Sequence, residues 1–220
     1  MTTRADLRTR IRDELNDNAA TKLWSDALLN GFVLDGLRDL GRRLPRHVQA
    51  SITSVANQEA YTLAAPLAGA GVEIVGVEHP VGYHRTPFRF AGGDVEPSTD
   101  VVPSISPDVL SYDAWAGTLY LRPAPSDATA AIVVRARVPY TEPASDATVL
   151  DVATQDEDLV MLFGCARALT WIGADEAKRQ RSGRERGADA STMRDHYRAR
   201  YEAMMKARTS AVRSRRLVSR

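Results

Sequence analysis

The spacing of apolar residues changes twice along this chain, which limits its possible folds more than any other feature. Apolar residues recur at three- and four-residue intervals over residues 4–44, alternate with polar residues between 48 and 140, and return to the helical interval from residue 154. The helical interval predicts amphipathic helices and the alternation predicts half-buried strands. The sequence therefore predicts an α+β protein. The N- and C-terminal helices are expected to bury their apolar faces in one bundle, and a β-domain is inserted between them in the sequence.

Two helices are expected in the N-terminal segment, residues 1–47. Thr3 and Asp6 have the spacing of a capping box, and Ser25 is the expected N-cap of the second helix with Trp24 packed ahead of it. The stripe of the first helix consists of Leu7, Ile11 and Leu15. The stripe of the second consists of Leu29, Phe32, Val33, Leu37, Leu40 and Leu44.

The middle segment, residues 48–150, is expected to form an antiparallel β-sandwich or a small barrel, because short strands follow one another without intervening helices. We expect one hairpin from residues 51–55 and 61–63, joined by a turn at 57–59, and a second from residues 111–113 and 118–122. Further strands are expected at 72–77, 131–140 and, more weakly, 85–90, with a surface loop at 91–107.

Two more helices are expected in residues 151–205. The first begins with Thr154 and Glu157 in capping-box spacing and ends near Gly173, and the last is capped by Thr192 with Asp195. An Arg-rich connection joins them over 178–187. The apolar stripe of the last helix is either bundle core or an interaction face, and consists of Met193, Tyr197, Tyr201, Met204 and Met205.

Charge is sorted by position although the whole chain has a net charge of only +1. Residues 46–175 carry 7 Lys and Arg against 16 Asp and Glu, whereas residues 176–220 carry 14 against 5. A near-neutral protein of this kind has little long-range attraction to a polyanion, but it can attract another copy of itself or an acidic partner surface. The pattern favours assembly over catalysis.

Two basic clusters are the candidate interaction sites. The Arg-rich connection could contact nucleic-acid backbone or carboxylates, or simply be solvated, and contains Lys178, Arg179, Arg181, Arg184 and Arg186. Residues 206–220 form a basic C-terminal arm with too few apolar residues to fold by itself, so that disorder and docking into a partner both stay open. Its candidate docking residues are Lys206, Arg208, Arg213, Arg215, Arg216, Leu217, Val218 and Arg220.

Signatures of catalysis or cofactor binding are not found, so neither an enzyme nor a cofactor is predicted. The chain has one cysteine, Cys165, and four scattered histidines, and its Gly-rich stretch at 69–71 precedes a strand instead of a helix. The acids at 156–158 fit the first turn of a helix better than a metal site. There is no run of about 18 apolar residues, which excludes a membrane span, and the default site of synthesis is the cytoplasm.

Several short motifs, in order along the chain, resemble tailed-bacteriophage head-to-tail adaptor proteins. Among them is the Trp-Ser-Asp entry to the second helix, Trp24-Ser25-Asp26. The motifs that carry the resemblance lie at residues 7–15, 24–30, 37–45, 74–80, 117–123, 156–159 and 166–169.

The resemblance implies a structural virion protein of the neck between head and tail, made in the host cytoplasm. Such adaptors form a ring, usually a dodecamer, beneath the portal protein, with a channel for DNA. Their C-terminal segment reaches the portal, and the other side of the ring meets a tail or nozzle protein. Contact with DNA would be transient and non-specific. A competing hypothesis is a nucleic-acid-binding protein that uses the Arg-rich C-terminal region and loses affinity steeply with salt.

Overall fold

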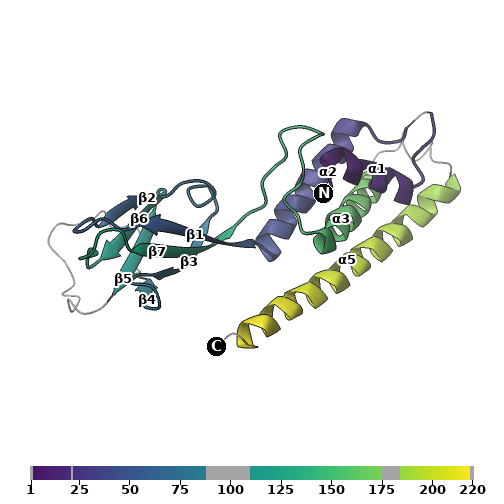
Figure 1. Cartoon of the computed structure of the whole chain (residues 1–220). Coiled ribbons are helices and arrows are strands. Elements are labelled where there is room, and N and C mark those ends of the chain that lie inside the picture. Colours follow the sequence, from purple (N-terminus) through teal and green to yellow (C-terminus); the bar gives the residue numbers. More distant parts are fainter. Residues whose placement is uncertain (1, 21, 88–109, 175–183, 219–220) are drawn as a thin grey trace. The chain divides into compact units, whose positions relative to one another are not determined.

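A computed structural model of the chain describes residues 2–20, 22–87, 110–174 and 184–218 (Figure 1). It divides into two compact units, here named the helical unit, Met1–Pro45 with Tyr140–Arg220, and the β unit, Arg46–Pro139. The predicted α+β class is confirmed, because the helices lie in the first unit and the strands in the second.

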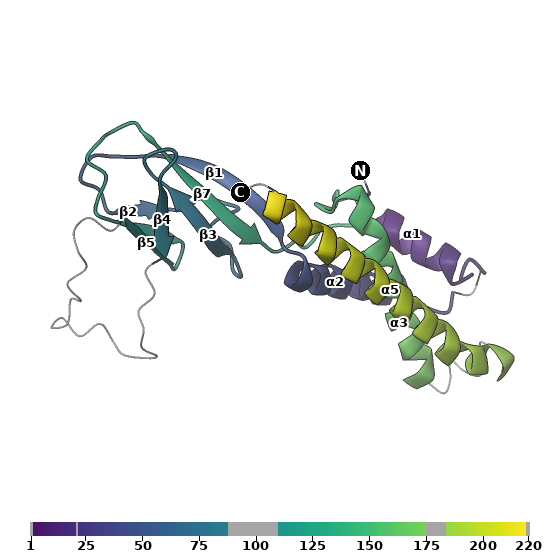
Figure 2. The same ribbon diagram turned by 90° about the horizontal axis from the view of Figure 1, so that it is seen from below.

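The described residues of the helical unit form two helices near each end of the sequence, which pack on one another (Figures 1 and 2). They are α1 (Arg4–Glu14), α2 (Asp26–Arg43), α3 (Thr154–Ala174) and α5 (Arg184–Val218). A single apolar core joins all four. Its side chains with 2% exposure or less include Leu7 and Ile11 of α1, Leu29, Val33, Leu37 and Leu40 of α2, and Leu159, Val160, Leu162, Cys165 and Ala168 of α3. From α5 it takes Tyr197, Tyr201 and Met205.

Both predicted N-caps of the first two helices are confirmed. The Thr3 hydroxyl accepts from the Asp6 backbone N–H while the Asp6 carboxylate accepts from the Thr3 N–H, so that the capping box is complete. The Ser25 hydroxyl accepts from the Leu28 N–H. Trp24 is buried against the core, and its indole N–H donates to the Ala168 carbonyl oxygen of α3 at 3.2 Å.

The bounds of the C-terminal helices differ from those predicted. α3 includes Thr154 as its first helical residue, so Thr154 is not its N-cap. α5 begins at Arg184 instead of Thr192, and continues to Val218, beyond the predicted end at residue 205. Met193, expected on the apolar stripe, is 42% exposed. The last helix is therefore much longer than its apolar stripe, which lies near its middle.

The β unit contains seven strands among the described residues, in the order β1-β7-β3-β4-β5-β6-β2. They are β1 (Arg46–Thr53), β2 (Ala60–Thr62), β3 (Glu73–Glu78), β4 (His84–Pro87), β5 (Ser111–Trp115), β6 (Thr118–Arg122) and β7 (Ala131–Val138). No pairing of β1 with β2 closes this order in the described part of the chain, so the small barrel, one of the two predicted alternatives, is wrong.

One predicted hairpin is confirmed and the other is wrong. β5 and β6 pair antiparallel around a turn at Ala116 and Gly117, which both have positive φ. In contrast, β1 pairs with β7 and β2 pairs with β6, so residues 51–55 and 61–63 do not pair with each other. The sheet is also not wholly antiparallel, because β4 and β5 run parallel. The predicted loop at 91–107 lies outside the described residues.

A buried arginine ties β4, β5 and β6 together at the point where the parallel pair begins. Arg85 is 5% exposed and donates to the carbonyl oxygens of Arg122 and Pro123 at 3.1 and 3.0 Å and of Ser111 at 3.4 Å. Burial lowers the pKa of Arg85 from its ordinary value. The charge is satisfied by backbone carbonyls, which is how an arginine without a carboxylate partner among the described residues is accommodated in a core.

Candidate interaction site on the helical unit

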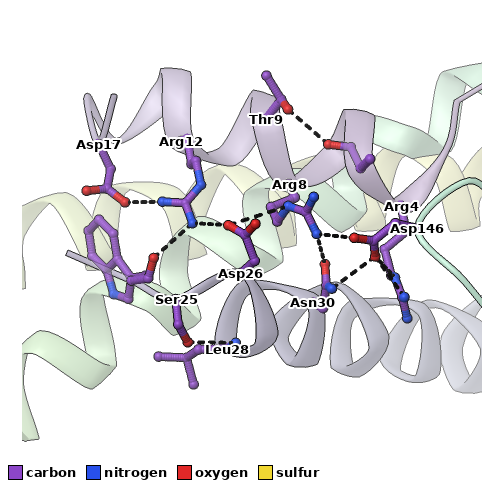
Figure 3. Close-up of polar contacts among 12 residues, drawn as sticks. Arg4, Arg8, Thr9, Arg12, Asp17, Ser25, Asp26, Leu28, Asn30 and Asp146 are labelled. Carbon is purple, nitrogen blue, oxygen red and sulfur yellow. Dashed lines mark hydrogen bonds and ion pairs between the residues drawn. The ribbon is translucent and has the colours of Figure 1, made fainter. Parts of the chain in front are cut away.

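A row of three arginines lies along α1 beside its apolar stripe. Arg4, Arg8 and Arg12 are four residues apart, so they share one helix face. Figure 3 shows Arg8 and Arg12 directed toward Asp26 of α2, and Arg4 and Arg8 directed toward Asp146 of the return segment, residues 140–150, that leads from the β unit to α3. The row fixes α1 in place through charged contacts, next to the stripe on which Leu7 and Ile11 are fully buried.

Asp146 of the return segment is the acceptor for two of these arginines. Arg4 approaches Asp146 Oδ1 at 2.7 Å and Arg8 donates to its Oδ2 at 2.7 Å (Figure 3). Asn30 of α2 donates to Asp146 Oδ1 at 3.1 Å and accepts from Arg8 at 3.0 Å. The Ala5 N–H also donates to the Asp146 carbonyl oxygen at 3.2 Å. One carboxylate thus joins α1, α2 and the return segment.

Arg12 is the most buried member of the row, with a side chain only 6% exposed. It donates to Asp17 at 2.5 Å, to Asp26 at 2.6 Å and to the Trp24 carbonyl oxygen at 2.8 Å. Asp17 also accepts from the Leu23 N–H at 2.7 Å. A buried charge with this many partners is compensated, and it holds the α1–α2 connection in one conformation.

Two carboxylates of this network, Asp26 and Asp146, have lowered pKa values. Hydrogen bonding to Arg12 is the main cause for Asp26. Hydrogen bonding to Arg8 is the main cause for Asp146, and hydrogen bonding to Arg4 adds to it, while burial opposes them. Both acids are therefore held in the charged form, which keeps the arginine row neutralised above their ordinary titration range.

Two tyrosines anchor the middle of α5 to the N-terminal helices. The Tyr197 hydroxyl donates to Glu14 of α1 at 3.3 Å, and the Tyr201 hydroxyl donates to Asp39 of α2. Burial raises the pKa of both phenols, that of Tyr197 to about 12. Tyr201 also meets the ring of Phe163 edge-on at 5.6 Å between centroids. The tyrosine stripe is thus core, and each hydroxyl has a polar partner.

A buried ion pair marks the last described anchor between α5 and the other helices. Arg208 donates to both oxygens of Asp156, at 2.6 and 3.2 Å, and the Asp156 side chain is only 4% exposed. Hydrogen bonding to Asp156 raises the pKa of Arg208. Asp156 lies in the first turn of α3, where the helix dipole also favours a negative charge. The neighbouring acids Glu157 and Asp158 accept from Arg10 of α1.

The structure places the predicted site residues in three different situations. Lys178, Arg179, Arg181 and Arg220 lie outside the described residues. Arg184, Arg186, Arg213, Arg215, Arg216, Leu217 and Val218 lie on the helical backbone of α5, so the arm for which the sequence predicted no fold of its own is helical up to Val218. Lys206 is exposed, and Arg208 is engaged by Asp156 within the chain.

The residues that hold this unit together include several that the sequence did not suggest. Neither Asp146 nor the pairing of Asp156 with Arg208 is visible from local spacing, because each connects positions more than fifty residues apart. One usable signal was the spacing of Arg4, Arg8 and Arg12, which places three cations on one face of a short helix and so indicates an acidic partner.

Sites for other chemistry were also sought among the described residues. They contain no group of three or more His, Cys, Asp or Glu side chains placed to hold a metal ion. Cys165 is fully buried, and burial raises the pKa of its thiol to about 12, so it is not an activated nucleophile. None of the described helices has both the length and the apolar composition needed to span a bilayer.

Comparison with known families gives the decisive observation. Residues 2–220 match the model of a family described as SU10 adaptor protein. The chain belongs to this adaptor family. No curated protein matches the chain. The predicted resemblance to phage head-to-tail adaptors is therefore confirmed at the level of the family. Membership makes this adaptor a bacteriophage structural protein that works with other phage structural proteins as a component of the virion.

Proposed function

We propose that this adaptor forms a ring of identical copies that joins the portal protein of the head to a tail or nozzle protein. In this proposal the four helices form the bundle of each copy, the β unit is a sandwich-like insert, and the ring surrounds a channel for DNA. Family membership over residues 2–220 supports this assignment. The neck of the virion is the corresponding location.

One observation supports the C-terminal end of α5 as the portal-docking segment. The helix continues from its last described anchor, Arg208, to Val218. Residues 206–220 contain six Lys and Arg and no acid. The anchors within the chain fix the direction of α5, and the residues that follow extend from a fixed base. A helix held in this way loses less conformational entropy on docking than a disordered arm would.

The docking segment is best defined as residues 211–220. Arg208 already has a partner within the chain, so it acts as the base of the segment, and the cations that we propose to meet the portal are Arg213, Arg215, Arg216 and Arg220. These cations fit a carboxylate-bearing surface on the portal. Individually such contacts are weak at an exposed interface, but a ring would make many at once.

A truncation after Ser210 tests the docking role, because it keeps the Arg208–Asp156 pair intact. We expect the truncated chain to retain its helical circular dichroism and to lose binding to purified portal protein. A full-length variant with Arg213, Arg215 and Arg216 all changed to Gln is the matched control for length, and should also bind weakly. Unchanged portal binding by the truncated chain would refute the docking role.

The nucleic-acid-binding alternative is supported by exposed cations along the described part of α5, namely Arg198, Arg200 and Lys206. They share this helix with Glu202, which pairs with Arg43 at 2.8 Å, and with Asp195. The acidic excess in residues 46–175 also opposes binding of the isolated chain to DNA. We therefore propose only transient, non-specific DNA contact, made from the assembled ring.

A further inference from the structure

At β1, an edge strand of the β unit, the apolar core is incompletely covered. β7 is the only neighbour of β1 in the strand order of the described residues. The core-facing residues of β7, Ile132, Val134 and Ala136, are fully buried. The core-facing residues of β1 are only half-buried, although they pack against the same core: Val48, Ala50 and Ile52.

This uncovered edge is specific to β1. At the opposite end of the strand order, β2 is only three residues long, and Tyr61 at its centre is 3% exposed. β1 has eight residues in regular register with β7 and contains no Pro and no bulge. Long regular edge strands are templates for pairing with another chain, and proteins commonly interrupt them for that reason.

The hydrogen bonds at the end of β1 show which backbone groups face outward. The Ser54 N–H donates to the Ala130 carbonyl oxygen at 2.8 Å, and the Ser54 carbonyl oxygen accepts from Thr129 at 3.0 Å. Because backbone groups in a strand alternate in direction, Ile52 and Ala50 also direct theirs toward β7. Gln49 and Ser51 direct their N–H and C=O groups toward the open edge.

We propose that β1 pairs antiparallel with β1 of a second copy of this chain, about a two-fold axis through Ala50. This register places Gln49 opposite Ser51 of the second copy, so that outward backbone groups on each side meet and form about four hydrogen bonds around the axis. It also places Val48 opposite Ile52 of the second copy, and Ala50 opposite its own counterpart.

The register is self-complementary in every respect that decides pairing. Apolar side chains oppose apolar ones on the core face, polar side chains oppose polar ones on the other, and like charges are not opposed around the axis. Shifting it by one residue would place Val48 opposite Ser51 and would set core-facing residues against solvent-facing ones. The pair would extend the sheet and cover the half-buried row of each copy.

The pairing goes beyond the proposed function and does not rest on it. An isologous contact of this kind is two-fold, whereas the copies of a ring that all face the portal are joined by heterologous contacts. The β1 pair therefore belongs to the free chain, in which it protects an edge that would otherwise be open to unwanted pairing.

Two cysteine variants of the full chain test the register. In the proposed pair the two copies of Ala50 form a non-hydrogen-bonded pair, with Cα atoms about 4.5 Å apart, close enough for a disulfide. Ala50→Cys should therefore give a covalent dimer on mild oxidation. Ser51→Cys is the matched control, because its two copies lie diagonally, about 7–8 Å apart, and should remain mostly uncrosslinked. The native Cys165 is fully buried and should not contribute.

Light scattering after size exclusion gives an independent measurement. At tens of micromolar the unmodified chain should have twice its mass of 24.1 kDa. Ser51→Pro removes an outward N–H while the β7 pairing is kept, and should return the mass to that of one chain with unchanged circular dichroism. A monomeric unmodified chain, or equal crosslinking of the Ala50→Cys and Ser51→Cys variants, would overturn the proposal.

Discussion

α1 and α3 approach each other closely at Gly164, which gives a quantitative test of the helical core. A Cβ atom added to Gly164 would lie 2.6 Å from Ile11 Cδ1 and 3.4 Å from Ile11 Cγ1. Ile11 is fully buried, so its side chain has little room to move. In contrast, a Cβ atom at Gly31 of α2 would meet no atom within 4 Å. The two glycines thus separate packing from helix propensity.

Gly31→Ala should stabilise the helical unit by about 1 kcal/mol, because Ala is the better helix former. Gly164→Ala gains the same propensity term but overpacks a full core, which costs about 1–3 kcal/mol. We therefore expect Gly164→Ala to range from neutral to about 2 kcal/mol less stable than the unmodified chain. The difference between the two variants, about 1–3 kcal/mol, measures the overlap with Ile11.

Urea unfolding followed by helical circular dichroism measures both free energies of unfolding. A double-mutant cycle with Ile11→Val identifies the clashing atom, because valine lacks Cδ1. Ile11→Val alone should cost about 0.5–1.5 kcal/mol, and its cost should be smaller in the Gly164→Ala background. Equal stabilisation by Gly31→Ala and Gly164→Ala, or strict additivity in the cycle, would refute the described contact.

Two further predictions concern the charged contacts of the helical unit. Arg208→Met leaves the buried Asp156 carboxylate without its partner and should destabilise the chain by about 2 kcal/mol. The loss is smaller than for a fully buried pair because the Arg208 side chain is 21% exposed. Thermal unfolding measures this loss, and the double variant Arg208→Met with Asp156→Asn should recover part of it. The folded-state pKa values of Asp26 and Asp146 lie below the ordinary 3.8, so their contribution to stability is complete above that pH and is lost as the pH falls through the lowered values. Acid titrations of unfolding should accordingly show a shallower decline for Asp146→Asn than for the unmodified chain, and parallel curves would contradict the assignment.

Local structure was predictable from the sequence, whereas strand pairing was not. The caps at Thr3 and Ser25 depend on neighbouring residues, and the apolar stripes depend on spacing within one helix, so both follow from short windows of sequence. Alternation identifies a strand and its buried face but not its partner. The pairing of β1 with β7 joins residues 78 to 92 positions apart, which is why the adjacent segments 51–55 and 61–63 were wrongly expected to pair.

The length of α5 shows a second limit of sequence interpretation. Residues 184–187 and 206–218 have few apolar side chains, so the sequence predicts a connection for the first and an arm without a fold of its own for the second. However, extending an existing helix adds a hydrogen bond for each residue fixed and needs no new nucleus. Tyr197, Tyr201 and Arg208 hold the middle of α5, and the Arg- and Ala-rich sequence on both sides has good helix propensity.

The anchors of α5 also change the meaning of the sorted charge. Part of the attraction between the acidic and basic stretches is already satisfied within one chain, since Asp156 pairs with Arg208. That pair is the last described contact between α5 and the other helices, and it lies about ten residues before the end of the chain. The cations beyond it, from Arg213 to Arg220, are the ones for which an intermolecular role remains to be assigned. If they dock on the portal, the internal pair sets the angle at which they approach it, so the loss of Arg208 should weaken portal binding even though Arg208 itself does not touch the portal.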